Sequence, residues 1–123
     1  MSLEIQSHIT GGILQVAEYD FSEEITFEEA HQLCKDLGNG WRLPNSGELE
    51  LIYESLHRKG KGNFKETCYW ESSGRKFNFA NGRLAPQIKQ QRIPGVYYPP
   101  AKERVRAVLT LPKPSIFSRL LRW

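Results

Sequence analysis

A short turn-forming stretch constrains the fold of this chain more than any other feature. Residues 40–45 read Gly-Trp-Arg-Leu-Pro-Asn, and apolar residues at helical spacing follow directly. Asn45 and Glu48 match a capping box, in which the two side chains satisfy the first free amides of a helix. Pro44 keeps its neighbour out of helical geometry. The stretch therefore predicts a sharp turn that carries a large aromatic side chain and starts a helix over residues 46–57.

A second helix is predicted ahead of the turn. Thr26 and Glu29 form another capping-box pair, and apolar residues continue at helical spacing as far as Leu37. Gly38 supplies the residue that commonly ends a helix in left-handed geometry. We therefore expect a helix over residues 26–37.

Strand patterns dominate the rest of the chain. Asn81 and Gly82 are a strong signal for a two-residue type I′ hairpin turn, in which both central residues have positive φ. The predicted strands span residues 13–19, 68–72, 76–80, 83–88 and 104–111. Two helices followed by a small antiparallel sheet predict an α+β fold.

The length of 123 residues suits one domain with its own core. We expect a flexible lead at residues 1–12, one domain at 13–111 and a tail at 112–123. No apolar run approaches the roughly 18 residues that a membrane helix needs, so no transmembrane segment is predicted. The first residues lack a basic region followed by an apolar core, so no signal peptide is predicted either.

Charge is distributed unevenly along the chain. Residues 1–54 hold two basic and eleven acidic residues, whereas residues 55–123 hold fifteen basic and three acidic ones. One interpretation is that the two halves interleave their charges in the folded protein. The other is a basic patch that binds a polyanion such as a sulfated glycan or nucleic acid. The candidate patch residues are Lys59, Lys61, Lys65, Arg75, Lys76 and Arg83.

A proline-rich segment separates the last two predicted strands. Residues 87–103 contain three prolines and two adjacent tyrosines, too much proline for regular structure and too many residues for a simple turn. Tyrosines flanked by basic residues suit stacking on sugars or binding of peptide. The candidate ligand-binding residues are Lys89, Arg92, Tyr97, Tyr98 and Lys102. The alternative interpretation is that the prolines only stiffen a connection.

The C-terminal tail mixes apolar and basic residues. Residues 116–123 read Ile-Phe-Ser-Arg-Leu-Leu-Arg-Trp. This composition is compatible with packing back on the domain, with contact to a membrane surface, or with docking on a neighbouring subunit. In the last case Phe117 to Trp123 would support an oligomer and a structural role in an assembly.

The sequence contains no motif that predicts an enzyme or a cofactor. There is no phosphate-binding loop and no Gly-x-Ser-x-Gly motif. His31 and Cys34 lie three residues apart, but two ligands do not make a zinc site. Cys34 and Cys68 fit either a disulfide or two free thiols, with Cys34 expected to be an unreactive core thiol. We predict no catalytic residue, no cofactor and no metal.

Several conspicuous residues are interpreted as scaffold. Tryptophan and arginine dominate binding hot spots, but here their positions favour structural roles. Trp41 is expected under the second helix, and Arg42 is expected to bind loop carbonyls or an acidic side chain. Trp70 is expected to cover the sheet. The full set of scaffold residues is Trp41, Arg42, Pro44, Trp70, Asn81 and Gly82.

Five motifs occur in a fixed order along the chain: the helix from Glu29-Ala30 to Gly38, Gly-Trp-Arg-Leu-Pro at 40–44, Tyr-Trp-Glu-Ser-Ser at 69–73, Phe-Ala-Asn-Gly at 79–82 and Val-Arg-Ala-Val at 105–108. Together they resemble a bacterial domain family of unknown function typified by the Lcl C-terminal domain. Glu71, Lys76, Leu109 and the 87–103 spacing depart from the family pattern.

The resemblance implies a compact C-type-lectin-like fold, related to the formylglycine-generating enzymes, with two helices on a small antiparallel sheet. It also implies adjacent N- and C-terminal strands and a surface or secreted location. The calcium-binding loop and triplet of C-type lectins are missing, and carboxylates are too sparse for a calcium cage. The function predicted first is therefore non-enzymatic recognition of a glycan or protein without calcium.

Overall fold

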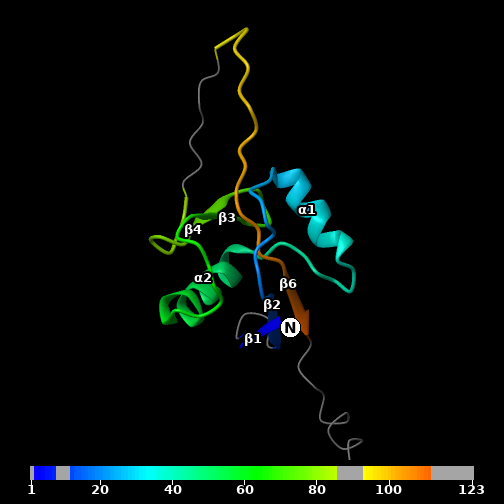
Figure 1. The fold of residues 1–123 in the computed structure, drawn as a ribbon, viewed down its shortest axis with the longest axis vertical. Coiled ribbons are helices and arrows are strands. Elements are labelled where there is room, and N and C mark those ends of the chain that lie inside the picture. The colour runs from blue at the N-terminus through cyan, green and yellow to red at the C-terminus, as the bar shows by residue number, and fades with distance from the viewer. Residues whose placement is uncertain (1, 8–11, 86–92, 112–123) are drawn as a thin grey trace, which may run out of the picture.

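The computed structural model describes residues 2–7, 12–85 and 93–111 of the chain. Within them, two α-helices and two three-stranded antiparallel sheets form a compact α+β fold, which confirms the predicted class (Figure 1). The elements are β1 (Ser2–Gln6), β2 (Ile13–Ala17), α1 (Phe27–Asp36), α2 (Ser46–Ser55), the 3-10 turn η1 (His57–Lys59), β3 (Cys68–Trp70), β4 (Lys76–Asn78), β5 (Arg83–Leu84) and β6 (Val108–Leu111).

Both predicted helices form, and each starts with the capping box that its sequence indicates. The Thr26 hydroxyl accepts a hydrogen bond from the Glu29 amide, and the Glu29 carboxylate accepts from the Thr26 amide. Asn45 and Glu48 repeat this arrangement at the start of α2. Because these pairs satisfy amides that have no partner within the helix, they fix where each helix begins.

The first sheet joins the two ends of the described chain in the order β1-β2-β6. β2 pairs antiparallel with β6, which places the first and the last of the predicted strands side by side as expected. β1 pairs antiparallel with β2, with Ile5 opposite Leu14. The prediction of a flexible lead is therefore wrong for residues 2–6. The physical reason is that alternating Leu3 and Ile5 face the core while Glu4 and Gln6 face solvent.

The second sheet has the order β3-β4-β5 and contains the predicted hairpin. Its turn differs from the prediction, because four residues separate Asn78 from its strand partner Arg83. The Gly82 amide donates to the Asn78 carbonyl at 2.8 Å, and Gly82 has positive φ whereas Asn81 does not. The type I′ prediction is wrong, because the loop has four residues, and the Asn78 and Asn81 side chains close it by accepting hydrogen bonds from the Ala80 and Arg83 amides.

The structure has two small sheets where one was predicted. β6 pairs with β2, while the backbone before β6 pairs with the second sheet at an isolated bridge between Tyr69 and Arg104. The chain over residues 103–107 therefore runs between the two sheets and connects them.

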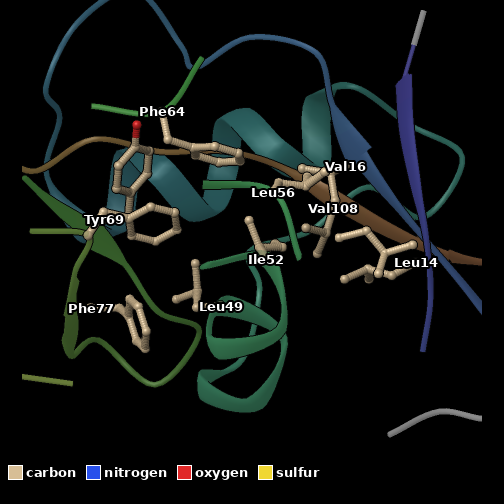
Figure 2. Packing of buried hydrophobic residues seen from close by; sticks show 11 residues of the cluster. Leu14, Val16, Leu49, Ile52, Leu56, Phe64, Tyr69, Phe77 and Val108 are labelled. Carbon is tan, nitrogen blue, oxygen red and sulfur yellow. The ribbon is translucent and has the colours of Figure 1, made fainter. Parts of the chain in front are cut away.

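Two apolar clusters form the core. The first, shown in Figure 2, lies between α2, the first sheet and the aromatic residues of the second sheet. Its fully buried members include Leu14, Leu49, Ile52 and Tyr69. The second cluster lies under α1 and contains Cys34.

Trp41 packs against the second cluster, not under α2, so that prediction is corrected. The reason lies in the turn after α1: the Trp41 amide donates to the Gly38 carbonyl, which folds the chain back along α1. The Arg42 backbone then pairs with Val108 of β6.

Candidate functional site

The most exposed described segment is the stretch of residues 93–103, called here the arm. In Figure 1 it extends away from both helices and both sheets as a long segment without regular structure. It covers the C-terminal part of the proline-rich segment for which ligand binding is predicted. Lys89 and Arg92 of that prediction lie outside the described residues.

The base of the arm is fixed to the body. Glu103 and Ile25 exchange two backbone hydrogen bonds, at 2.9 and 3.0 Å. The Glu103 carboxylate also lies 2.9 Å from Nζ of Lys76. One residue further on, the Arg104 carbonyl accepts from the Trp70 amide. The arm therefore leaves the body at a rigid point between the segment before α1 and the second sheet.

The tip of the arm is a closed turn. The Val96 amide donates to the Ile93 carbonyl at 3.2 Å, with Pro94 and Gly95 between them and Gly95 at φ +82°. Proline followed by a residue of positive φ is the pattern of a type II turn. The Tyr98 hydroxyl accepts a second hydrogen bond, from the Ile93 amide at 2.9 Å. These two bonds close the turn at the tip.

The tip presents apolar side chains to solvent. The exposed fractions are 64% for Ile93, 51% for Val96 and 81% for Tyr97. Residues 93–101 carry no charged side chain. Large exposed apolar residues that cluster on one protrusion mark an interaction site more often than single exposed ones do.

The structure refines the predicted ligand-binding residues. Tyr97 is the most exposed of the large apolar residues in the described chain, whereas Tyr98 is half-buried and uses its hydroxyl to support the turn. Lys102 is exposed near the base. The sequence reasoning missed Ile93 and Val96, although the Pro-Gly pair between them is a turn signal that could have identified the tip.

The proposed basic patch divides into two groups. Arg75 and Lys76 lie beside acidic partners, with Arg75 Nε 3.9 Å from Glu71 and Lys76 bound to Glu103. The other group comprises four exposed residues, Lys59, Lys61, Lys65 and Arg83. Within the described ranges, none of them forms an ion pair with an acidic side chain.

The scaffold residues contact other parts of the chain. Arg42 donates to both carboxylate oxygens of Glu48 at 2.7 Å and to the Leu43 carbonyl at 3.2 Å. The hydrogen bond to Glu48 raises the pKa of Arg42. The Trp70 indole, which is buried, donates to the Ile25 carbonyl at 2.7 Å.

The remaining scaffold residues shape turns. Pro44 is buried, and its carbonyl accepts from the Ser72 amide at 2.9 Å. Asn81 accepts from the Arg83 amide at 3.0 Å, and Gly82 lies against the Tyr53 ring.

The two cysteines are free thiols. Cys34 is fully buried under α1, and burial raises its pKa to about 11. Burial also raises the pKa of Cys68, and the nearby Glu103 carboxylate adds to the effect. A thiol with a raised pKa carries little thiolate at neutral pH and is a poor nucleophile. In the part of the chain that the structure describes, no three His, Cys, Asp or Glu side chains gather as a metal site would need.

Comparison with known proteins gives no relative. No family model, no curated protein and no solved structure matches this chain. The resemblance to the Lcl C-terminal domain family therefore depends on the five ordered motifs alone. No helix within residues 2–7, 12–85 and 93–111 is long and apolar enough to cross a membrane.

Proposed function

We propose that this protein is a non-enzymatic recognition domain that binds its ligand through the tip of the arm. The observation that carries the proposal is the exposure of Ile93, Val96 and Tyr97 on a turn closed by two hydrogen bonds. A turn that is already ordered loses little conformational entropy on binding, so more of the contact energy becomes affinity. None of the three side chains belongs to either core cluster of the described chain.

The shape and composition of the tip favour a protein ligand over a glycan. A protruding apolar turn fits a concave apolar site on a larger partner, as long antibody loops do. Ile93 and Val96 offer no hydrogen bonds from their side chains, whereas recognition of sugar hydroxyls depends on such bonds. Tyr97 is the residue of the tip best suited to stack on a sugar, so a glycan is the second ligand class in this proposal.

Polyanion binding by the second half is the other candidate function. It is supported by Lys59, Lys61 and Lys65, which are exposed and follow α2 closely in the chain. Their charges are available to an anionic ligand because none of these three lysines forms an ion pair with an acidic side chain of the described residues. Binding of this kind falls steeply as salt concentration rises, because it releases counterions.

Site-specific photocrosslinking tests the arm directly. A photoreactive phenylalanine analogue at position 97 would be compared with the same analogue at Tyr19, which is 67% exposed but lies outside the arm. Both proteins would be irradiated with cells and culture medium of the source organism. We expect a discrete adduct from position 97 only.

Competition distinguishes specific from incidental adducts. Excess unlabelled wild-type domain should suppress the adduct. For an Ile93→Ser, Val96→Ser double variant, the concentration needed for the same suppression should be at least about tenfold higher. This is the loss of affinity expected when a hot spot worth about 1.4 kcal/mol is removed. Equal competition by the variant would reject the arm as the binding element.

A glycan array that includes sulfated chains, read at two salt concentrations, tests the other ligand classes. Salt-sensitive binding to sulfated chains alone would favour the polyanion function.

A further inference from the structure

Beyond its closed tip, the arm returns to the body as an extended segment over residues 97–102 (Figure 1). Pro99 and Pro100 are adjacent in this segment, both are exposed, and the peptide bonds before them are trans. A proline ring fixes φ at about −65°, and a residue that precedes a proline is confined to extended geometry with ψ between about +120° and +160°. Pro99 is subject to both constraints, because Pro100 follows it. Its backbone is therefore polyproline II.

This geometry sets which side chains of the segment lie together. A polyproline II helix has about three residues per turn, so side chains three positions apart lie along one edge. Tyr97 and Pro100 are separated in this way, and both are exposed, Tyr97 by 81%. Tyr98 differs, because its hydroxyl accepts a hydrogen bond from the Ile93 amide within the tip. We call Tyr97 and Pro100 the arm ridge.

The prolines also disfavour pairing of this segment with a β-strand of another protein. A pairing strand donates backbone N–H groups along its edge, and Pro99 and Pro100 have none. A polyproline II segment makes no hydrogen bonds within itself, so its carbonyl oxygens can accept from donors of another protein. Residues 93–101 carry no charged side chain. The segment therefore offers a partner hydrogen-bond acceptors and apolar rings, without charge.

We propose that the arm ridge docks as a preformed polyproline II segment in a groove lined by aromatic side chains of a partner protein. This inference rests on the proposed function and names the class of partner. Tryptophan and tyrosine rings of the groove pack on the proline ring and on Tyr97, and their N–H and O–H groups donate to carbonyls of the segment. Because the two prolines preset the backbone, the segment loses little conformational entropy when it binds.

The backbone of the free protein gives the first test. NMR of the isotope-labelled full chain measures φ of Tyr98, which precedes Pro99 and has no ring to fix this angle. We expect about −75°, the polyproline II value. A value of about −140°, typical of an antiparallel strand, would overturn the proposal, because Tyr97 and Pro100 would then point to opposite sides of the segment.

Two neighbouring substitutions test which side of the segment the partner covers. Pro100→Glu places a charge on the arm ridge, and Ala101→Glu, the matched control, places the same charge on the next residue, which is also exposed. Each unlabelled variant competes for the position 97 photoadduct. For Pro100→Glu the half-suppressing concentration should rise at least about tenfold, because the groove would bury an unpaired charge. For Ala101→Glu it should rise less than about threefold, because this residue lies on another edge.

Other modes of binding predict other patterns. In strand pairing the side chains alternate with a period of two, so Ala101→Glu would weaken competition and Pro100→Glu would not. That pattern would overturn the proposal. Tolerance of both substitutions would overturn the arm ridge and leave recognition by Ile93 and Val96 of the tip in place. Absence of an adduct from position 97 would reject the proposed function together with this inference.

The crosslinked residue of the partner tests the groove itself. Mass spectrometry of the adduct should place the bond on a protein residue that lies beside tryptophan or tyrosine side chains in the partner's structure. Attachment to a carbohydrate, or to a surface without aromatic side chains, would overturn the proposal. Both glutamate variants should keep the wild-type midpoint of urea unfolding, since the arm lies outside both core clusters, which separates loss of binding from loss of folding.

Discussion

Nε of Arg106 lies 2.7 Å from Oδ1 of Asp20, although the two residues are 86 positions apart in the sequence. Arg106 is 1% exposed, and its guanidinium also donates to the carbonyl of Ala17. The second oxygen of Asp20 accepts from the Tyr69 hydroxyl at 2.6 Å. The guanidinium carbon lies 3.9 Å from the centre of the Phe64 ring. This buried pair joins the segment after β2 to the segment that carries the arm.

Removing one member of this pair should strongly destabilise the fold. Arg106→Met leaves the buried Asp20 carboxylate without its closest cation, and we expect a loss of about 3–5 kcal/mol in the free energy of unfolding. Urea unfolding measures it. Arg58→Ala is the control, because Arg58 pairs with Glu54 at the surface and should change stability by about 0.5 kcal/mol at most. Similar losses in the two variants would contradict a structural role for the buried pair.

Two glycines with the same backbone geometry should respond differently to alanine. Gly38 and Gly82 both have φ +72°. A Cβ on Gly82 would lie 2.4 Å from Cε1 of Tyr53, whereas a Cβ on Gly38 meets nothing within 4 Å. Gly82→Ala should therefore cost about 1–3 kcal/mol more than Gly38→Ala in urea unfolding, since only the former overpacks the core. Equal costs would show that the hairpin loop moves freely away from Tyr53.

Cys34 should make stability depend on pH in the alkaline range. Its folded-state pKa is about 11, above its ordinary value of 9.0, because burial disfavours the thiolate. The unfolded chain loses this proton first as pH rises, so the contribution is fully present below about pH 9 and is lost between about pH 9 and 11. At about pH 10.5 the loss should be about 2 kcal/mol.

Comparison with Cys34→Ala isolates this effect from other titrating groups. Urea unfolding of both proteins at about pH 8 and about pH 10.5 should show a larger decrease for the wild type. If Cys34→Ala lost as much stability as the wild type between these two pH values, the pKa of Cys34 would be the same in the folded and unfolded states.

The hydroxyl of Tyr98 should control the order of the tip without affecting the body. Tyr98→Phe removes the acceptor of the Ile93 amide proton, so exchange at that amide should accelerate about threefold or more. Global stability should change by less than about 0.5 kcal/mol, because the arm lies outside both core clusters. Hydrogen exchange read by NMR checks the first expectation and urea unfolding the second. An unchanged Ile93 amide would show that the backbone turn alone orders the tip.

Local signals explain the parts of the fold that could be predicted from the sequence. The capping pairs Thr26–Glu29 and Asn45–Glu48 act over three residues, so their effect can be recognised without tertiary structure. The sequence predicted that Arg42 binds loop carbonyls or an acidic side chain, since an arginine in a turn needs an acceptor. The acidic partner is Glu48.

Long-range contacts explain what the sequence did not reveal. Residues 105–108 are all buried, so this segment shows no alternation that would mark Arg106 as a core residue. Its partner Asp20 is distant in sequence and belongs to no motif. β1 was missed although Leu3 and Ile5 alternate with polar residues, because its pairing with β2 is a tertiary contact that five residues do not indicate by themselves. The apolar tip was missed because single apolar residues in a proline-rich segment have no periodicity.

The most direct test of the account separates binding from stability in one variant. Ile93→Ser, Val96→Ser alters only exposed side chains of the tip, so its free energy of unfolding should match the wild type within about 0.5 kcal/mol. The concentration at which it half-suppresses the position 97 photoadduct should rise at least about tenfold. Unchanged stability with unchanged competition would contradict the claim that the arm is the recognition element of this domain.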